Sequence, residues 1–438
     1  MNRRQHVAIA IADAMLSGPS ETRGFIERAT QCLGQRHRWI NALARQVFQR
    51  FGSSLHHGDR DKLAELIGAN RGYQGAWNAP RPPRVVHYFL DPPPMRPRTG
   101  ALAACDLPSI ATPGDLATWL GIPIGELDWF ADVRAMNPPQ GPLCHYRYTW
   151  IPKRFGARLV EAPKARLREL QRRILRGILD RVPPHRAAHG FRAGHSCRTF
   201  VEPHVGREVV LRMDLRNFFP GIPAARVHAL FETLGYPSAV ARLLTALCTN
   251  GVPMSVARRG AASWTEAKCL QVPHLPQGAP TSPALANLCA LHLDLRLDAL
   301  ATTLEGAYSR YADDLAISGG AAMRRSVRRL PTLVAAIASE EGFEVNHRKT
   351  RPMHRSHRQR LTGIVVNEKP NIPREDFDRL KAVLTNCVRH GPESQNRDGA
   401  LDFRAHLAGR IAYVASLNPG RGAKLLALHR KVDWDRPA

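Results

Sequence analysis

Two stretches of the chain alternate hydrophobic and polar residues with the period of a β-strand. Residues 208–216 carry a hydrophobic side chain at every second position and a carboxylate, Asp214, near the end. Residues 307–318 form two shorter alternating runs around a turn that contains Asp313 and Asp314. Because the side chains of a strand point alternately to its two faces, the pattern predicts a sheet strand and a β-hairpin whose turn carries two adjacent carboxylates.

Elsewhere the hydrophobic residues recur every three to four positions, which is typical of helices that bury one face. Residues 1–70 predict several such helices, and shorter ones follow at about 112–121 and 125–136. An amphipathic helix with arginines on its outer face follows Lys164, and another helix begins near Ala284. We expect this last helix to place four residues in the core: Ala286, Leu288, Leu291 and Leu295.

Prolines and helices divide the chain into parts. Nine prolines between residues 79 and 114 exclude long helices or strands there, so this stretch is a linker or an extended segment. Three helices close the chain, at about residues 375–389, 401–417 and 423–432. We therefore expect three parts: an N-terminal helical extension with its linker at residues 1–140, a mixed body at 141–368, and a helical domain at 369–438.

The carboxylates on these strands are the first candidate chemistry. A pair such as Asp313 and Asp314 is also common in solvated turns and carries little weight alone. Asp214, near the end of another strand, could join them at one site, and carboxylate oxygens are the ligands that Mg²⁺ prefers. Two Mg²⁺ ions on three carboxylates would suit phosphoryl transfer, with one ion activating an attacking hydroxyl and the other binding phosphates.

The net charge points to a class of partner. The 438 residues include 63 Lys and Arg against 37 Asp and Glu, a formal net charge of +26, with an isoelectric point near 10.7. This balance favours a polyanion, above all nucleic acid, although an arginine-rich surface can also serve solubility alone. The hydrophobic share of 44% is ordinary for a globular protein with a buried core.

Cysteine spacing and hydropathy favour a cytoplasmic protein. The eight cysteines form no Cys-x-x-Cys pair, so neither a zinc ribbon nor a disulfide framework is expected, and reduced thiols fit the cytosol. No hydrophobic run reaches transmembrane length. The hydrophobic run at residues 6–16 is interrupted by Asp13 and lacks a convincing cleavage site. We expect no membrane partner.

An ordered series of segments carries a resemblance to a known family. The string Leu-Pro-Gln-Gly at residues 275–278 is moderately specific alone and becomes strong between the acid segments 213–220 and 311–314. The whole series comprises residues 151–164, 189–196, 213–220, 275–283, 311–314, 342–350 and 361–363. With these segments in this order, the chain resembles reverse transcriptases and, within them, the bacterial retron-type enzymes.

The resemblance implies a fold and an active site. The fold would be an α+β right-hand polymerase with fingers and palm at residues 141–368, an RNA-binding thumb at 369–438, and an N-terminal helical extension. The catalytic residues that hold two Mg²⁺ ions would be Asp214, Asp313 and Asp314. Lys349 matches a family lysine proposed to protonate the pyrophosphate leaving group, although a surface lysine would fit the sequence equally well.

Nucleotide-binding residues follow from the same resemblance. Residues 148–164 predict a hairpin that turns at Phe155 and Gly156 and projects three basic side chains, Lys153, Arg154 and Arg158. Arg158 would clamp the triphosphate of the incoming deoxynucleotide, unless the turn is only a solvated basic one. Phe219 would be the steric gate that excludes a 2′-hydroxyl, and Phe218 a core residue. Gln277 and Gly278 would contact the nucleotide and the template.

RNA and primer would meet the chain near its C-terminal third. Residues 361–367 read as a strand pair resembling the primer grip, with Leu361, Thr362 and Gly363 at its start. The stretch before it is strongly basic and adds three expected RNA-binding residues, Arg355, Arg358 and Arg360.

The implied function is RNA-directed DNA synthesis with deoxynucleotides. A structured noncoding RNA would serve as template and primer source, and the product would be single-stranded DNA linked to RNA in an RNA–DNA hybrid. The resemblance further implies anti-phage defence and leaves room for an effector protein. The alternatives are a non-retron defence or group II intron-like reverse transcriptase, and a non-catalytic RNA-binding scaffold, against which the three aspartates argue.

Overall fold

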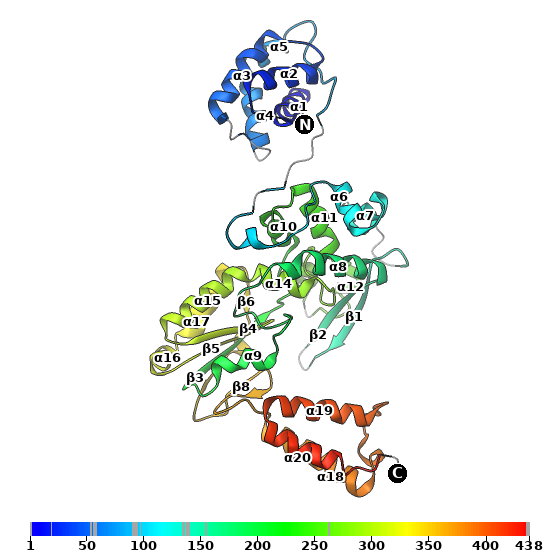
Figure 1. Cartoon of the computed structure of the whole chain (residues 1–438), viewed down its shortest axis with the longest axis vertical. Coiled ribbons are helices and arrows are strands. Elements are labelled where there is room, and N and C mark those ends of the chain that lie inside the picture. Colours follow the sequence, from blue (N-terminus) through cyan, green and yellow to red (C-terminus); the bar gives the residue numbers. More distant parts are fainter. Residues whose placement is uncertain are drawn as a thin grey trace. The chain divides into compact units, whose positions relative to one another are not determined.

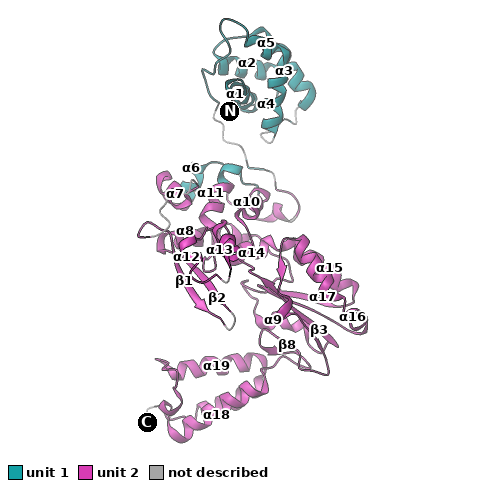
Figure 2. Ribbon diagram, turned by 180° about the vertical axis from the view of Figure 1, so that it is seen from behind, with its two compact units in different colours: residues 1–97, 109–119, 235–240 teal, residues 98–108, 120–234, 241–438 magenta. Residues whose placement is uncertain are grey.

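The computed structural model describes residues 2–18, 20–52, 55, 59–89, 95–96, 98–133, 136, 141–153, 156–261 and 263–434. The chain divides into two compact units, coloured separately in Figure 2. One unit comprises residues 1–97, 109–119 and 235–240, and the other comprises residues 98–108, 120–234 and 241–438.

The first unit contains a bundle of helices with its own core (Figure 1). Its helices are α1 (Arg3–Leu16), α2 (Thr22–Leu33), α3 (Arg38–Phe51), α4 (Arg60–Ala69) and α5 (Arg71–Ala76). In α3 the buried residues Ile40, Leu43 and Val47 recur at helical spacing, which confirms the prediction of packed helices in this region. Short helices follow at η3 (Gly100–Ala104), α6 (Pro113–Leu120) and α7 (Ile124–Ala131).

The second unit is organised around an antiparallel sheet. Strand β3 (Val209–Arg216) pairs with β5 (Asp314–Gly319) on one side, and with β6 (Glu344–Val345) and β7 (Arg351–His354) on the other. Strand β4 (Ala307–Tyr311) extends the sheet beyond β5. Since β3 has neighbours on both edges, its residues are nearly all buried, and the predicted strand and hairpin are confirmed.

Helices cover both faces of this sheet. Helices α14 (Ser282–Cys289), α15 (Leu291–Thr303), α16 (Ala321–Ser326) and α17 (Leu330–Glu340) follow the loop 275–281 and the hairpin. Figure 1 shows α15 and α17 side by side along the strands. The short elements α9 (Cys197–Val201) and η5 (Glu202–His204) contact β4 and β5.

One prediction about this region was wrong. Leu291 and Leu295 are exposed, the latter by 47%, whereas Ala286 and Leu288 lie in the core as expected. The single helix expected here is two, because α14 ends at Cys289 and α15 begins at Leu291. The buried face of α15 carries a different set of side chains, which leaves Leu291 and Leu295 outside it: Leu293, Asp294, Leu297 and Ala301.

A second antiparallel hairpin lies in the N-terminal half of this unit. Strands β1 (Tyr146–Pro152) and β2 (Ala157–Pro163) pair from Tyr146 with Pro163 to Pro152 with Ala157. The predicted hairpin is confirmed, but Arg154 and Phe155 of its tip lie outside the described residues. The surrounding helices are α8 (Ala165–Gly177), η4 (Leu179–Arg181), α10 (Ala224–Thr233), α11 (Ser238–Cys248), α12 (Met254–Ala257) and α13 (Trp264–Gln271).

The C-terminal helices share a core with the sheet. The short strands β8 (Arg360–Leu361) and β9 (Ile364–Val365) precede α18 (Arg374–His390), η7 (Glu393–Gln395), α19 (Phe403–Leu417) and α20 (Pro419–His429). Leu361 and Ile364 are buried in one cluster with Phe200, Val210 and Ala316. In the described part of the chain, no helix is both long and apolar enough to cross a membrane.

Candidate active site

The three aspartates predicted from the sequence come together at one end of the sheet. Asp214 lies near the end of β3 and is the register partner of Asp314, the first residue of β5. Asp313 belongs to the turn between β4 and β5, and its carbonyl accepts a hydrogen bond of 2.8 Å from the Leu215 amide. The turn residue Ala312 has a φ of 55°, a region that residues other than glycine seldom adopt.

A glycine on a neighbouring segment allows this turn to pack closely. A Cβ atom on Gly190 would lie 2.6 Å from the Ala312 nitrogen, so no larger residue fits there. The same segment pairs with β4, since the His189 amide donates to the Arg310 carbonyl at 2.8 Å. Residues 189–196 belong to the series of family-like segments, but no role was predicted for them. Through His189 and Gly190 they pack against the strand and turn that carry Asp313 and Asp314.

Cationic side chains neutralise two of the three carboxylates. Lys349, in η6 (His347–Lys349), places Nζ 2.8 Å from Oδ2 of Asp214. Arg212 donates from Nε and Nη2 to Oδ1 of Asp314, at 3.0 and 2.8 Å. Asn346 Nδ2 lies 3.2 Å from Asp214 Oδ1. Asp214 and Asp314 are thus held in place by charge-assisted hydrogen bonds.

Asp313 lies in a different electrostatic environment. Burial raises the pKa of its carboxyl above the usual value, and the charges of Asp214 and Asp314 raise it further, while Lys349 lowers it. Carboxylates that repel one another in this way favour a bound cation. Among the described residues no group of three His, Cys, Asp or Glu side chains is arranged to hold a metal ion. The aspartates offer hard oxygen ligands, which fit Mg²⁺. To bind a metal ion, Asp214 would have to lose its contact with Lys349, or Asp314 its contact with Arg212.

A buried polar network that sequence reasoning missed supports the hairpin from its other face. Arg310 and Asp294 are fully buried and joined by bonds of 2.8 Å to Nε and 2.6 Å to Nη2. Arg310 Nη1 also donates to the Ala312 carbonyl at 3.2 Å and to the Asn287 side chain at 3.0 Å. Because removal of one partner would leave a buried charge unpaired, this network fixes the turn strongly. The one signal of this network in the sequence is a charged residue, Arg310, inside a predicted strand.

Aromatic rings border the aspartates. Phe219 is half-buried, and its ring centroid lies 5.4 Å from that of Phe218 and 6.1 Å from that of Phe191. Phe218 is buried against Phe343, which agrees with its assignment to the core. Phe191 is 54% exposed and has a φ of 59°, a strained conformation for a bulky residue. Its ring also lies 6.3 Å from that of Tyr311, so Phe191 belongs to this site although no role was predicted for it from the sequence.

The basic hairpin lies close to the same site, and the loop 275–281 contacts this hairpin, since the Glu161 amide donates to the Gln277 carbonyl. Burial lowers the pKa of Lys153, and the positive charges of Arg158 and Lys349 lower it further, whereas Asp313 and Asp214 raise it. The Lys153 ammonium group therefore lies close enough to the aspartates to interact with their negative charges. Arg158 is exposed on β2, Gln277 is partly exposed and Gly278 is exposed, so all three can be reached by a ligand.

The residues expected to contact RNA or primer differ in their exposure. Leu361 is fully buried and cannot contact RNA, so its predicted role in RNA binding was wrong. The expected RNA contacts at this turn are limited to its neighbours Thr362 and Gly363. Thr362 has a φ of 45°, and its buried hydroxyl has no hydrogen-bond partner among the described residues. Arg355, Arg358 and Arg360 are exposed, and Arg358 pairs with Glu375 at 3.0 Å.

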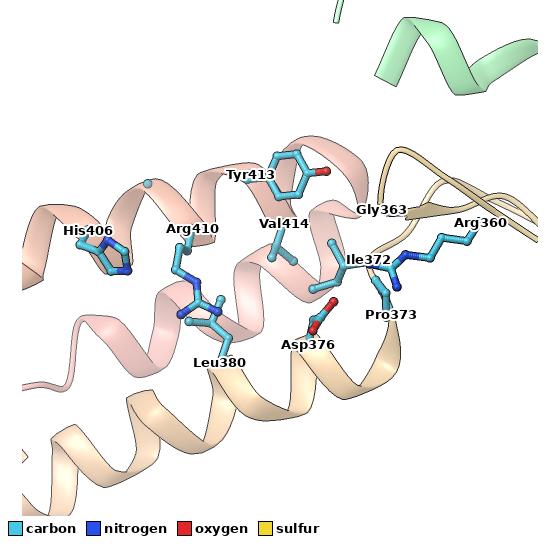
Figure 3. A pocket seen from close by; sticks show the side chains of 11 residues that line it. Arg360, Gly363, Ile372, Pro373, Asp376, Leu380, His406, Arg410, Tyr413 and Val414 are labelled. Atoms are coloured by element: carbon cyan, nitrogen blue, oxygen red, sulfur yellow. The ribbon is translucent and has the colours of Figure 1, made fainter. Parts of the chain in front are cut away.

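A groove of about 520 Å³ extends from this turn along α18 and α19 (Figure 3). Ile372, Leu380 and Val414 contribute hydrophobic side chains to its lining. Polar and aromatic side chains line the rest: Arg360, Asp376, His406, Arg410 and Tyr413. Tyr413 is 47% exposed. Exposed aromatic and arginine side chains over a hydrophobic floor can stack on bases and bind phosphates.

Comparisons with known proteins agree with this geometry. Residues 151–366 match the family model described as reverse transcriptase (RNA-dependent DNA polymerase). The chain is 41% identical to the retron Mx65 reverse transcriptase of Myxococcus xanthus over 342 residues, 77% of this chain and 75% of that protein. It is 37% identical to the retron Mx162 reverse transcriptase of the same organism over 331 residues, 71% and 65% of the two chains. It is 30% identical to the retron Ec86 reverse transcriptase of Escherichia coli over 277 residues, 63% and 77% of the two chains.

Proposed function

This chain belongs to the bacterial retron reverse transcriptases and is an RNA-directed DNA polymerase, and from that premise we propose that it copies a structured noncoding RNA into single-stranded, RNA-linked DNA. The observation that carries the proposal is the convergence of Asp214, Asp313 and Asp314 at one end of the sheet. The relatives reported above all bear the retron name, which favours this function over a non-retron or intron-type enzyme.

We assign the right-hand polymerase parts accordingly. Residues 141–368 are fingers and palm, with the β1–β2 hairpin in the fingers and the five-stranded sheet in the palm. Residues 369–438 are the thumb, and residues 1–140 are the N-terminal extension. The shared core of β8, β9 and the C-terminal helices with Val210 and Ala316 supports a thumb anchored on the palm.

Enzymes with this domain generally use divalent metal ions. We propose two Mg²⁺ ions held by Asp214, Asp313 and Asp314; when bound, they supply activation of the attacking hydroxyl and charge stabilisation at the phosphates. Lys349 would then release Asp214 and turn to the leaving pyrophosphate as a proton donor.

The other residues of the site bind and select the nucleotide. Lys153 and Arg158 provide positive charge for the triphosphate from the fingers. Gln277 and Gly278 border the base and the template, and the φ of 130° at Gly278 lets the backbone approach a ligand closely. Phe219 is the proposed gate against a 2′-hydroxyl, and its contacts with the rings of Phe218 and Phe191 at the border of the site support this role.

The thumb would hold the RNA. Arg355, Arg358 and Arg360 supply phosphate contacts before the turn, and the partly exposed turn residues Thr362 and Gly363 contact the primer. The groove beside α19 adds Arg410 and Tyr413. A net charge of +26 supports a polyanionic template-primer and an RNA–DNA hybrid product.

We place the reaction in the cytoplasm and in anti-phage defence, with an effector protein as a further partner. The described cysteines form no disulfide bond, which supports a reducing compartment. The test is to sequence the nucleic acid that co-purifies with the protein after gentle isolation and proteinase treatment. DNA joined to one noncoding RNA through a 2′-branch supports the retron function. DNA free of covalently attached RNA overturns the retron function and leaves the polymerase activity standing.

A further inference from the structure

A buried charged pair connects the fingers hairpin to the loop that carries Gln277. Glu161 on β2 and His274 before the loop are each only 1% exposed. His274 Nε2 lies 3.1 Å from Glu161 Oε1, and Asn250 Nδ2 donates to Glu161 Oε2 at 2.7 Å. Neither residue belongs to the catalytic or nucleotide-binding sets described above.

The hydrogen bonds of His274 define the proton content of this pair. Its Nδ1 lies 2.6 Å from the Val272 carbonyl and its Nε2 faces the Glu161 carboxylate, so both ring nitrogens face acceptors. Each contact needs a hydrogen, and the pair therefore holds one proton more than a neutral imidazole beside a carboxylate. Burial by itself lowers the pKa of His274. The hydrogen bond to Glu161 and its negative charge raise this pKa by more, so that it lies above the usual value for histidine.

Glu161 also contacts the nucleotide loop through its backbone. Its amide donates to the Gln277 carbonyl at 2.8 Å. Its carbonyl oxygen would lie 3.0 Å from a Cβ atom on Gly278, which leaves room there for glycine alone. His274 in turn exchanges two backbone hydrogen bonds with Asn250, at 2.9 and 3.0 Å. One residue of β2 thus contacts His274 and the loop residues Gln277 and Gly278.

We propose that the Glu161–His274 pair is a positioning device that fixes Gln277 and Gly278 against the fingers hairpin, so that the pocket for the incoming deoxynucleotide is formed before the substrate binds. The inference rests on the proposed nucleotide-binding role of Gln277. A buried pair of this kind holds its geometry firmly, because separating the partners would leave a charge without compensation. Preorganisation of this sort lowers the cost of binding the nucleotide.

Other titratable groups around the pair do not change charge near neutral pH. Tyr146 and Tyr148 on β1 face Glu161, and burial raises the pKa of both phenols well above the usual value. Cys248, at the end of α11, has its pKa raised by burial to about 12. As pH rises above neutral, we therefore expect the Glu161–His274 pair itself to lose a proton. This loss leaves a buried negative charge beside the loop.

The test compares three variants in steady-state primer extension with the full-length protein. Glu161→Ala removes the pair, and we expect the KM for deoxynucleotide to rise about tenfold or more with a smaller change in kcat. Glu161→Gln keeps the shape: its amide oxygen accepts from Asn250, and its NH₂ donates to a neutral His274. Its KM should stay near that of the unaltered protein.

Gln171→Ala is the matched control. Gln171 is a buried side chain of α8 whose amide donates to the Tyr146 hydroxyl and the Leu247 carbonyl and, among the described residues, to no residue of the loop. It should lower the Tm without raising KM. Should Glu161→Ala fail to fold, Glu161→Asp keeps the charge, shortens the reach, and should also raise KM.

The pH profile separates positioning from simple stability. Both ring nitrogens of His274 face acceptors and its pKa is raised, so the pair loses its proton only as pH rises through that raised pKa. KM for the unaltered protein should therefore rise on the alkaline side relative to that of Glu161→Gln. If Glu161→Ala has the same KM as the unaltered protein while Gln277→Ala raises KM, the inference is overturned and the nucleotide-binding role of Gln277 stands. An unchanged KM in Gln277→Ala would instead overturn the nucleotide-binding role of Gln277.

Discussion

Lys349 Nζ and Asp214 Oδ2 lie 2.8 Å apart, although 135 residues separate them in the chain. Asp214 is the most buried of the three aspartates, and the lysine supplies the positive charge that its burial requires. Lys349, the proposed proton donor to the leaving group, therefore has a second role. It compensates the negative charge of the Asp214 carboxylate, which could otherwise bind a metal ion.

Replacing Lys349 should separate these two tasks. We expect Lys349→Met to lower kcat on the order of 100-fold, because it removes a general acid, and to lower the Tm because Asp214 loses its partner. Lys349→Arg should restore the Tm and leave kcat low, since guanidinium is a poor acid. Full activity in Lys349→Met would exclude the lysine from the chemical step.

Asp313→Asn should abolish DNA synthesis and leave the fold intact. We expect kcat to fall at least about 100-fold, because a ligand of the catalytic metal site is lost. Since the ionised form of Asp313 is disfavoured by burial and by its two acidic neighbours, the neutral variant should be at least as stable as the unaltered protein. The measurements are primer extension, thermal unfolding and RNA binding.

Asp298→Asn provides a control for this variant. Asp298 lies on α15 and pairs with Arg186 at 2.8 Å, away from the turn. Its substitution should leave primer extension unchanged. Normal DNA synthesis by Asp313→Asn would remove the central assignment of the site.

Phe219→Ala should admit ribonucleotides. The substitution empties the space that a 2′-hydroxyl needs, so selection for deoxynucleotides should fall on the order of tenfold or more, measured with mixed nucleotides. Phe231→Leu is the control, because Phe231 is fully buried on α10 and should affect stability without affecting sugar selection. Unchanged selection in Phe219→Ala would assign this ring to the core as well.

Loss of the basic stretch before the primer-grip turn should weaken RNA loading. The triple variant of Arg355, Arg358 and Arg360 to Ala should bind the structured RNA less tightly and with a flatter salt dependence, by at most about one slope unit per lost phosphate contact. Arg358 should contribute least, since Glu375 already pairs with it. Extension of a preformed primer-template should suffer less.

A charge-matched control uses the exposed arginines around α16. Replacing Arg325, Arg328 and Arg329 with Ala removes the same three charges at another place on the surface. Equal losses of RNA affinity in the two triple variants would mean that net charge, and not this stretch, determines binding. Adding Arg410→Ala and Tyr413→Ala to the first variant should deepen its defect if the groove beside α19 holds RNA.

His204 should make the fold sensitive to acid. It is fully buried, with ring nitrogens 2.7 Å from Ser318 Oγ and 2.6 Å from Ser309 Oγ, and burial lowers its pKa to about 3. The unfolded chain binds this proton near pH 6.5, so stability falls as pH drops, by up to about 1.4 kcal/mol per unit. Unfolding of His204→Gln should depend less steeply on pH below about 6.5; an identical slope would contradict the assignment.

The sequence alone determined the local structure and the order of the chemical groups. The alternation of residues 208–216 fixed β3 and put Asp214 near its end, and the two short runs around Asp313 fixed the hairpin. These features follow from neighbouring residues, because the period of hydrophobic positions and the turn-forming residues act over a few positions. The net charge likewise required no structure to favour a nucleic-acid partner.

Only the tertiary structure decided which distant residues compensate one another. Glu161 and His274 are 113 residues apart, and Arg212 and Asp314 are 102 apart. No periodicity encodes such pairs, since they arise when buried charges must find partners in the packed interior. The same packing leaves Leu291 and Leu295 exposed and joins the buried Asp294 to Arg310, because the face of α15 that carries Leu293 and Leu297 is the one that packs into the core.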